Sequence, residues 1–473
     1  MTDTPENTVP TIPPAKKPGL LKRLLGMGAT GDELEIAFAP FIDAAGVDHA
    51  KNIAAAFAGR DGLHVTQLRE QPVLNGAVNR ADQLPTACSQ AMGWIGKYHA
   101  DLVIWGDVPP PGTTLFLHFA APPPVDNDPA GTISPFQALN LPVGFDPNQL
   151  GALLLAAALA ALNPNTEAKR QNRRALVAET LERAAEAMNH LPTDFTTRET
   201  ASVHAMFANS LAAFGHLFPG TEVYHRAAQA YTKALQGTLR TESPTNWAYL
   251  QRNNGTVLQA IGERTDDIVI LEQAAQAYRA ALEVFAFETT PFPWATTQNR
   301  LGEVLYRVDN KSGETEGLKE ALKLYQGALK VLNKTSTPLL WSETMNNLGQ
   351  TAQVLGRELG NAEVLERSIE ACRQALSVRT RDAHPTLWAS TQNNMGSALF
   401  LMGRMTKEDK YFEAALGAFM GAREVYEQLG LTRMVEVTEK NIAHTEQRLP
   451  EGASTGDGKD ATMWWLEEED GSS

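Results

Sequence analysis

Residues Trp294–Gly302 have the sequence WATTQNRLG, and two related stretches follow, WSETMNNLG at Trp341–Gly349 and WASTQNNMG at Trp388–Gly396. Each begins 47 residues after the previous one, and Trp247 continues the series towards the N-terminus. A proline stands three residues before each tryptophan, at Pro244, Pro291, Pro338 and Pro385. One pattern at a fixed step is typical of proteins in which similar structural units stack.

Each unit is predicted to consist of two helices joined by a turn. Proline begins a segment that cannot continue the preceding helix, and small residues let two helices approach closely. In the unit that starts at Trp294, we expect a first helix to about Arg307 and a second from about Glu316 to Leu332. The small residues that keep the 47-residue step are Gly255, Gly302, Gly349 and Gly396 on the first helix, and Ala234, Ala281, Ala328, Ala375 and Ala422 on the second.

Two further rows make specific predictions about helix ends and the core. A second glycine row is expected to cap the first helices, with Asp309 replacing glycine in one unit; its members are Gly215, Gly262, Gly356 and Gly403. An aromatic row on the second helix contains Tyr231, Tyr278, Tyr325, Cys372 and Phe419. Cys372 is therefore predicted to be a buried core residue and not a reactive thiol.

The strings at Trp294–Gly302, Trp341–Gly349 and Trp388–Gly396, with the pattern Ala-x-x-x-Tyr-x-x-Ala-Leu at Ala274–Leu282, resemble tetratricopeptide repeats of the long-unit bacterial variety. The resemblance covers about residues 195–449. It implies a mostly α-helical protein, an α-α superhelical solenoid of 47-residue units, and binding of a protein or peptide. The tryptophan column is expected to pack between hairpins.

The N-terminal part has a different pattern and predicts a small α/β domain. Strand-like runs at 34–41, 63–68, 102–105 and 113–119 alternate with helix-like stretches at 48–58 and 84–99. The segments Ile36–Phe41 and His99–Asp107 resemble the TolB N-terminal-like domain, which implies a role in interaction and oligomerisation. The apolar run Leu150–Leu162 predicts a buried helix with Asp146 as N-cap and Pro147 in its first turn.

The chain divides into six predicted segments. These are a basic, Pro-rich arm at 1–32, the α/β domain at 33–125, a linker at 126–145, a capping helical hairpin at 146–194, the repeat array at 195–449, and an acidic tail at 450–473. The formal net charge of -14 opposes nonspecific attraction to nucleic acid. Two cysteines far apart and an N-terminus without a signal-peptide pattern favour a cytoplasmic protein.

No motif predicts catalysis. Residues Gly26–Gly31 fit GxGxxG, but they precede the first predicted strand, whereas a dinucleotide site needs the loop between a strand and a helix. The histidines are scattered without metal-ligand spacing. We therefore expect no catalytic residue, no metal and no cofactor. A nucleotide- or small-ligand-sensing role for the α/β domain is the first alternative.

The first helices supply the candidate binding residues. An asparagine offers both a donor and an acceptor, which suits the main chain of an extended peptide. The predicted peptide-binding groove contains Asn253, Asn299, Asn346, Asn393, Gln259, Tyr306, Gln353 and Phe400. The alternative role for the asparagines is hydrogen bonding between neighbouring helices of the array.

Both termini could also bind partners. Trp464 and Trp465 with Glu467, Glu468 and Glu469 form a predicted docking motif for a partner or for the protein's own groove. Lys16, Lys17, Lys22 and Arg23 alternate with leucines and could rest on an acidic membrane surface, which makes a peripheral membrane organiser the second alternative. The predicted function is a non-catalytic scaffold for a protein or peptide, and the sequence indicates no oligomeric state.

Overall fold

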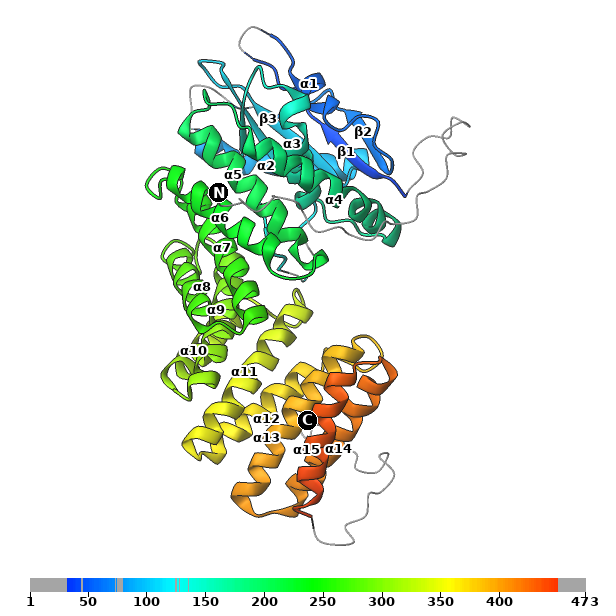
Figure 1. Ribbon diagram of the computed structural model, residues 1–473, viewed down its shortest axis with the longest axis vertical. Coiled ribbons are helices and arrows are strands. Elements are labelled where there is room, and N and C mark those ends of the chain that lie inside the picture. Colours follow the sequence, from blue (N-terminus) through cyan, green and yellow to red (C-terminus); the bar gives the residue numbers. More distant parts are fainter. Residues whose placement is uncertain are drawn as a thin grey trace, which may run out of the picture. The chain divides into compact units, whose positions relative to one another are not determined.

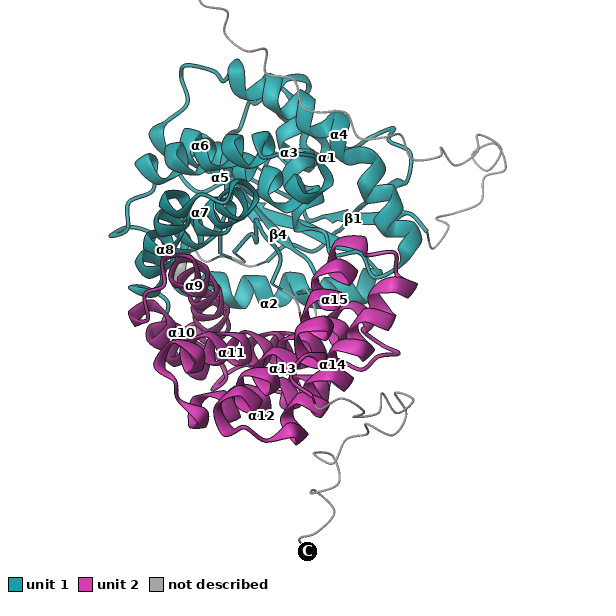
Figure 2. Ribbon diagram, turned by 60° about the horizontal axis from the view of Figure 1, so that its bottom comes forward, with its two compact units in different colours: residues 1–124, 128–285 teal, residues 125–127, 286–473 magenta. Residues whose placement is uncertain are grey.

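The computed structural model describes residues 32–43, 46–72, 74, 80–123, 126, 128–134 and 136–449. The protein is mostly helical, with a small sheet near the N-terminus (Figure 1). It divides into two compact units, residues 1–124 with 128–285, and residues 125–127 with 286–473 (Figure 2). The division falls inside the predicted repeat array.

The sheet of the first unit has the order β2-β1-β3-β4-β5. β1 is parallel to β2 and β3, while β4 is antiparallel to β3 and β5 is antiparallel to β4. The strands are β1 (Leu34–Phe38), β2 (Leu63–Gln67), β3 (Leu102–Asp107), β4 (Thr114–Ala120) and β5 (Leu139–Pro142). The first four coincide with predicted strands. β5 lies in the stretch 126–145, where the sequence predicted a linker.

Helices cover both faces of the sheet because its strands alternate between two apolar clusters. One cluster joins Val103 and Trp105 of β3 to Ala87 and Ala91 of α2 (Arg80–Tyr98). The other joins Ile36 of β1 to α3 (Pro147–Ala161), α4 (Glu167–Asn189) and α5 (Thr197–Phe214). A further helix, α1 (Ala50–Ala55), contributes Ile53 to the same cluster.

α3 confirms the prediction of a buried helix at the apolar run. Its residues from Leu150 to Leu159 are buried, and Pro147 is its first residue. The carboxylate of Asp146 accepts a hydrogen bond from the main-chain N–H of Asn148 at 2.9 Å, as expected of an N-cap.

The rest of the chain forms helical hairpins. In the first unit α5 pairs with α6 (Glu222–Gly237), after the short 3-10 helix η2 (Gly215–Leu217), and α7 (Pro244–Thr265) pairs with α8 (Ile268–Leu282). In the second unit α9 (Pro291–Ser312) pairs with α10 (Glu316–Ala328), α11 (Pro338–Leu359) with α12 (Ala362–Leu376), and α13 (Pro385–Thr406) with α14 (Asp409–Gln428). α15 (Thr432–Glu446) packs on α14. The first helices begin at the prolines, one turn earlier than expected.

The glycine and aromatic rows meet inside the hairpins. A Cβ added to Gly302 of α9 would lie 2.6 Å from the ring of Tyr325 on α10, and one on Gly396 of α13 would lie 2.8 Å from the ring of Phe419. Cys372 takes the same place opposite Gly349, and its thiol is fully buried. Burial raises the pKa of Cys372 to about 12, which confirms a core residue and excludes a reactive thiolate.

The prediction that the second glycine row caps the first helices is wrong for three units. Gly262, Gly356 and Gly403 lie inside α7, α11 and α13. Added Cβ atoms there would meet the side chains of Leu271, Leu365 and Phe412 at 2.8, 2.8 and 3.1 Å, so these glycines serve close packing. The helices end four residues later, at left-handed residues that keep the 47-residue step: Asp266, Gly313, Gly360 and Lys407.

Asp309 also has a packing role and does not end its helix. It is buried in α9, and its Oδ2 atom accepts a hydrogen bond from the main-chain N–H of Leu318 at 3.1 Å. The space for this carboxylate comes from Gly317, where an added Cβ would lie 2.7 Å from Oδ1 of Asp309. A carboxylate in one helix and a glycine in the next thus replace the usual arrangement of a glycine and a larger side chain.

Candidate peptide-binding surface

Side-chain amides link the first helices of the second unit in a row that we call the asparagine ladder. The Nδ2 atom of Asn347 donates to Oδ1 of Asn299 at 3.4 Å, that of Asn394 to Asn346 at 3.1 Å, and that of Asn441 to Asn393 at 3.2 Å. These bonds run from α11 to α9, from α13 to α11 and from α15 to α13. The ladder therefore has the role between neighbouring helices that the sequence left as an alternative.

The ladder consists of two rows of the repeat and not one. Residues 299, 346 and 393 form one row at the 47-residue step, and residues 300, 347, 394 and 441 form the next. Asn253 belongs to the second row, because the residue 47 positions before Asn299 is Arg252. The four predicted asparagines are therefore not equivalent. Asn347, Asn394 and Asn441 are not among the predicted groove residues, although each lies one residue after a position of the first row.

The eight predicted groove residues differ in accessibility. Asn253, Asn299, Asn346 and Gln259 are buried, whereas Asn393, Tyr306, Gln353 and Phe400 are half-buried. Oε1 of Gln259 accepts a hydrogen bond from the Tyr278 hydroxyl at 2.8 Å, and Phe400 makes an edge contact with Phe412 of α14, with ring centroids 5.6 Å apart. Both contacts lie within a hairpin, between α7 and α8 for Gln259 and between α13 and α14 for Phe400.

Two further accessible polar residues on the first helices of the second unit lie beside the ladder. Gln350 follows Asn346 and Asn347 by four and three residues on α11, and Ser397 has the same relation to Asn393 and Asn394 on α13, so they share one face of each helix. Asn347, Asn394, Gln350 and Ser397 are all half-buried. We call the surface formed by these four residues the ladder face.

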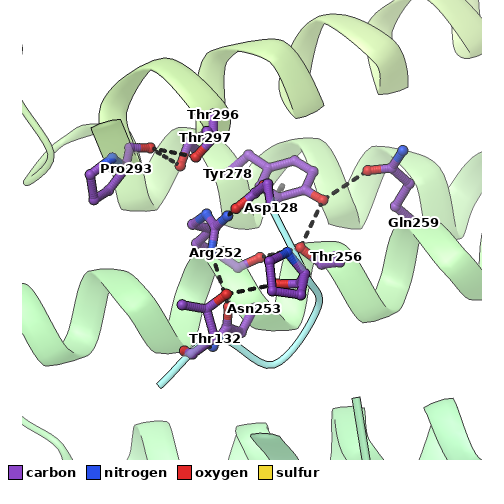
Figure 3. A network of polar contacts seen from close by, with 11 residues as sticks. Asp128, Thr132, Arg252, Asn253, Thr256, Gln259, Tyr278, Pro293, Thr296 and Thr297 are labelled. Atoms are coloured by element: carbon purple, nitrogen blue, oxygen red, sulfur yellow. Dashed lines mark hydrogen bonds and ion pairs between the residues drawn. The ribbon is translucent and has the colours of Figure 1, made fainter. Parts of the chain in front are cut away.

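In the first unit, the corresponding helix α7 binds a segment of the protein's own chain. Part of the connection between β4 and β5, residues 128–134 with 136 and 137, contacts α5 and α7. We call this part the inner segment. The carboxylate of Asp128 forms an ion pair with Arg252, and both side chains are buried (Figure 3). The Nδ2 atom of Asn253 donates to the main-chain carbonyl of Thr132 at 2.8 Å. An α7 side chain thus binds the main chain of a non-helical peptide segment.

Asn209 of α5 holds the other end of the inner segment. Its Nδ2 atom donates to Oε1 of Gln137 at 3.4 Å, and its Oδ1 atom accepts from Asn253 at 3.1 Å and from the Tyr231 hydroxyl at 2.8 Å. Burial raises the pKa of Tyr231 well above its usual value, so the hydroxyl stays protonated and donates. Asn209 and Asn253 therefore form one buried network that orients the amide of Asn253 towards the segment.

Gly131 lets the inner segment lie directly against the backbone of α5. Its φ of +71° is in the left-handed region, and an added Cβ would lie 2.2 Å from the main-chain oxygen of Asn209. A residue with a side chain cannot occupy this position without moving the segment or the helix. Asp128, Gly131 and Thr132 were not predicted as site residues. The sequence feature that points to this site is an arginine at position 252, where the later units have an asparagine.

The start of α11 in the second unit binds another carboxylate of the same connection. Asp126, which groups with the second unit, accepts hydrogen bonds from the main-chain N–H groups of Leu339 and, at 2.9 Å, Leu340. These N–H groups have no partner within the helix, and the positive end of the helix dipole favours an anion there. Asp126 thus has the role of an N-terminal cap for α11.

All four tryptophans of the column contact neighbouring side chains, and Trp294 packs against the apolar cluster that contains Trp341. Trp341 is buried, and the guanidinium groups of Arg240 and Arg381 lie 5.1 and 5.5 Å from the ring centroids of Trp247 and Trp388. The tail residues Trp464, Trp465, Glu467, Glu468 and Glu469, the Gly26–Gly31 motif and the basic arm lie outside the described residues.

Two cavities of about 360 and 300 Å³ lie in the first unit. Pro109–Pro111 and the start of α5 line the first, while Asn140, Ser202 and the turn between α6 and α7 line the second. The hydroxyl of Ser202, in the second cavity, accepts a hydrogen bond from the main-chain N–H of Asn140 at 2.9 Å and donates one to the carbonyl of the same residue at 3.2 Å. Its role there is to hold β5 against α5.

No family model matches the chain, and no curated protein matches it significantly. In the described part of the chain, no helix is both long and apolar enough to cross a membrane, and no cluster of three or more potential ligands is placed to hold a metal ion. The candidate site therefore rests on the geometry of the helices alone.

Proposed function

We propose that this protein is a non-catalytic scaffold of the tetratricopeptide type, which binds an extended segment of a partner protein on the ladder face of its second unit. The observation that carries the proposal is the hydrogen bond from Asn253 to the main-chain carbonyl of Thr132. It supports the idea that amides at this repeat position bind a peptide main chain without requiring a particular side chain.

The chemistry of the ladder favours a peptide over a small molecule. Each asparagine has one amide nitrogen and one amide oxygen, and a rung uses the nitrogen of one residue and the oxygen of the other. Asn347 and Asn394 are half-buried, so their oxygens can accept main-chain N–H groups while their nitrogens keep the helices together. A row of such acceptors at a regular step matches the repeating polar groups of an extended chain.

The helical array is the basis for the proposed kind of partner, and the two cysteine thiols are the basis for the proposed compartment. Neither Cys88 nor Cys372 forms a disulfide in the structure, and burial raises the pKa of Cys88 to about 11. Two thiols without a disulfide fit a reducing compartment, so we propose that the scaffold acts in the cytoplasm.

An α-α superhelix built by the 47-residue units would present the ladder face as one continuous strip.

Site-specific photocrosslinking in the native cell tests the proposal. A photoreactive benzoylphenylalanine in place of Gln350 lies on the ladder face, and the same group in place of the exposed Arg367 on α12 is the control. We expect a discrete protein adduct from position 350 and not from position 367, after circular dichroism shows that both variants are folded. An adduct from 367 alone, or no adduct from 350, contradicts the proposal.

A further inference from the structure

We propose that the inner segment is a built-in competitor that closes a second peptide site on α5 and α7, and that the partner fitting this site is an extended acidic segment with the spacing Asp-x-x-Gly-x. This inference rests on the proposed function. It adds a site in the first unit, the chemical class of its ligand and the means by which it is closed.

The charge at the site defines the first requirement of the partner. Arg252 is 2% exposed on α7, and the carboxylate of Asp128 forms an ion pair with it. Removing one partner of a buried ion pair strongly lowers the stability of the folded protein, because the remaining charge stays buried. A segment that replaces the inner segment must therefore bring its own carboxylate to Arg252.

The main chain defines the second and third requirements. Asn253 binds the carbonyl of Thr132, four residues after Asp128, so the partner needs an accessible carbonyl at that spacing. Between them, Gly131 has a left-handed φ and lies against the main-chain oxygen of Asn209. Glycine adopts this conformation readily and has no Cβ to collide with α5. Together these contacts define an acid, a glycine three residues later, and a bound carbonyl at the next residue.

The site uses the same two positions of the repeat as the ladder, one unit earlier in the chain. Arg252 and Asn253 occupy the two rows that α9 fills with Asn299 and Arg300 and that α11 fills with two asparagines. The inner segment therefore lies on the same helical face that carries the ladder in the second unit. In the first unit, the peptide bound on this face is therefore a segment of the protein's own chain.

Covalent connection explains how the site stays closed. A tethered ligand has an effective concentration in the millimolar range, so a free peptide of micromolar affinity displaces it poorly. Weakening the inner segment removes this competition without altering the residues of α5 and α7. A partner can then occupy the site in trans.

Binding of a synthetic peptide tests this directly. The probe is a fluorescein-labelled peptide of residues 126–138, DNDPAGTISPFQA, added to the full chain and followed by fluorescence anisotropy. In the Gly131→Val variant the added side chain displaces the inner segment, and we expect the peptide to bind at least ten times more tightly than to the wild-type chain. Asp128→Asn is the second variant, which removes the charge without adding volume and is expected to shift binding in the same direction.

Two controls link binding to the proposed contacts. A peptide with asparagine in place of the residue that corresponds to Asp128 should bind at least tenfold more weakly, and so should a scrambled peptide of the same composition. Adding Asn253→Ala to Gly131→Val should also weaken binding, because the amide that holds the carbonyl is lost.

The outcomes separate this inference from the proposed function. If Gly131→Val and Asp128→Asn are folded by circular dichroism and neither binds the peptide, the inner segment is a fixed brace and the inference is wrong. Equal binding to the wild-type chain and to both variants also overturns it, because the site would then not be closed. A crosslink from position 350 persisting in either case would leave the proposed function standing.

Discussion

The hydroxyl of Tyr278 on α8 donates a hydrogen bond to Oε1 of Gln259 on α7 at 2.8 Å, while its ring lies over Gly255 of the same helix. One side chain therefore closes the hairpin by packing and by a polar bond. Gln259 also donates to Glu263 at 2.9 Å. The amide predicted to face a peptide is used to hold the two helices together.

The close contact between Gly302 and Tyr325 predicts a large effect of a single methyl group. Gly302→Ala places a Cβ 2.6 Å from the ring in a packed interior, and we expect a loss of about 1–3 kcal/mol in the free energy of unfolding. Urea denaturation measures it. Gly93→Ala in α2 is the control, because its Cβ has no neighbour within 4 Å and helix propensity predicts a small gain. Equal effects of the two substitutions would contradict the packing role.

The left-handed residues that end the first helices predict a stabilising change. Lys407 has a φ of 63°, and the equivalent position is Gly313 in one unit and Gly360 in another. Because glycine adopts this conformation without strain, Lys407→Gly should stabilise the protein by about 1 kcal/mol. The melting temperature measures the change. The reverse substitution, Gly360→Ala, should lower it, and a rise on both substitutions would show that backbone strain is not the cause.

The ion pair between Asp128 and Arg252 predicts a strong effect of removing one partner. Asp128→Ala leaves a buried guanidinium without this carboxylate, and we expect a loss of about 3–5 kcal/mol if the segment stays in place. Glu242→Ala breaks the exposed pair with Arg198 and should cost less than about 1 kcal/mol. Urea denaturation compares the two. A small loss for Asp128→Ala, with fast hydrogen exchange at the Thr132 amide, would mean that the segment detaches instead.

His204 predicts a loss of stability in acid. Burial in α5, with a contribution from the charge of Lys233, lowers the pKa of His204 to about 4. The unfolded chain binds the proton at an ordinary pKa near 6.5, so this contribution is fully present above that pH and is lost as the pH falls towards 4. His204→Phe should reduce the shift of the urea midpoint between pH 7.5 and 4.5. An unchanged shift would assign the acid sensitivity to other groups.

Much of the fold follows from the sequence because its spacing reflects direct packing. The tryptophan, glycine and aromatic rows keep one step, since the same side chains meet in each hairpin, as Gly302 and Tyr325 do. The helix ends were misjudged because Gly262 and Gly356 look like caps in sequence, whereas their roles depend on Leu271 and Leu365 across the hairpin. β5 was missed because it spans four residues and includes a proline.

The candidate site was less predictable than the fold. The sequence identifies the amide residues of the first helices but not their hydrogen-bond partners, which lie 48 residues away. Because the repeat is 47 residues long, donors and acceptors belong to two rows that differ by one residue. The contacts of Asp128 and Thr132 with α7 cross more than a hundred residues and follow no local pattern. Only the folded chain brings them together.

The asparagine ladder gives the array a direction. Each rung joins a residue to the one 48 positions later, and always with the later residue donating. α11 therefore accepts at Asn346 from the helix that follows and donates from Asn347 to the helix that precedes. Neighbouring units fit together head to tail only. A second copy of residues 338–384 inserted after residue 384 would meet a matching donor on one side and a matching acceptor on the other, so the protein could be lengthened one unit at a time without new interface chemistry.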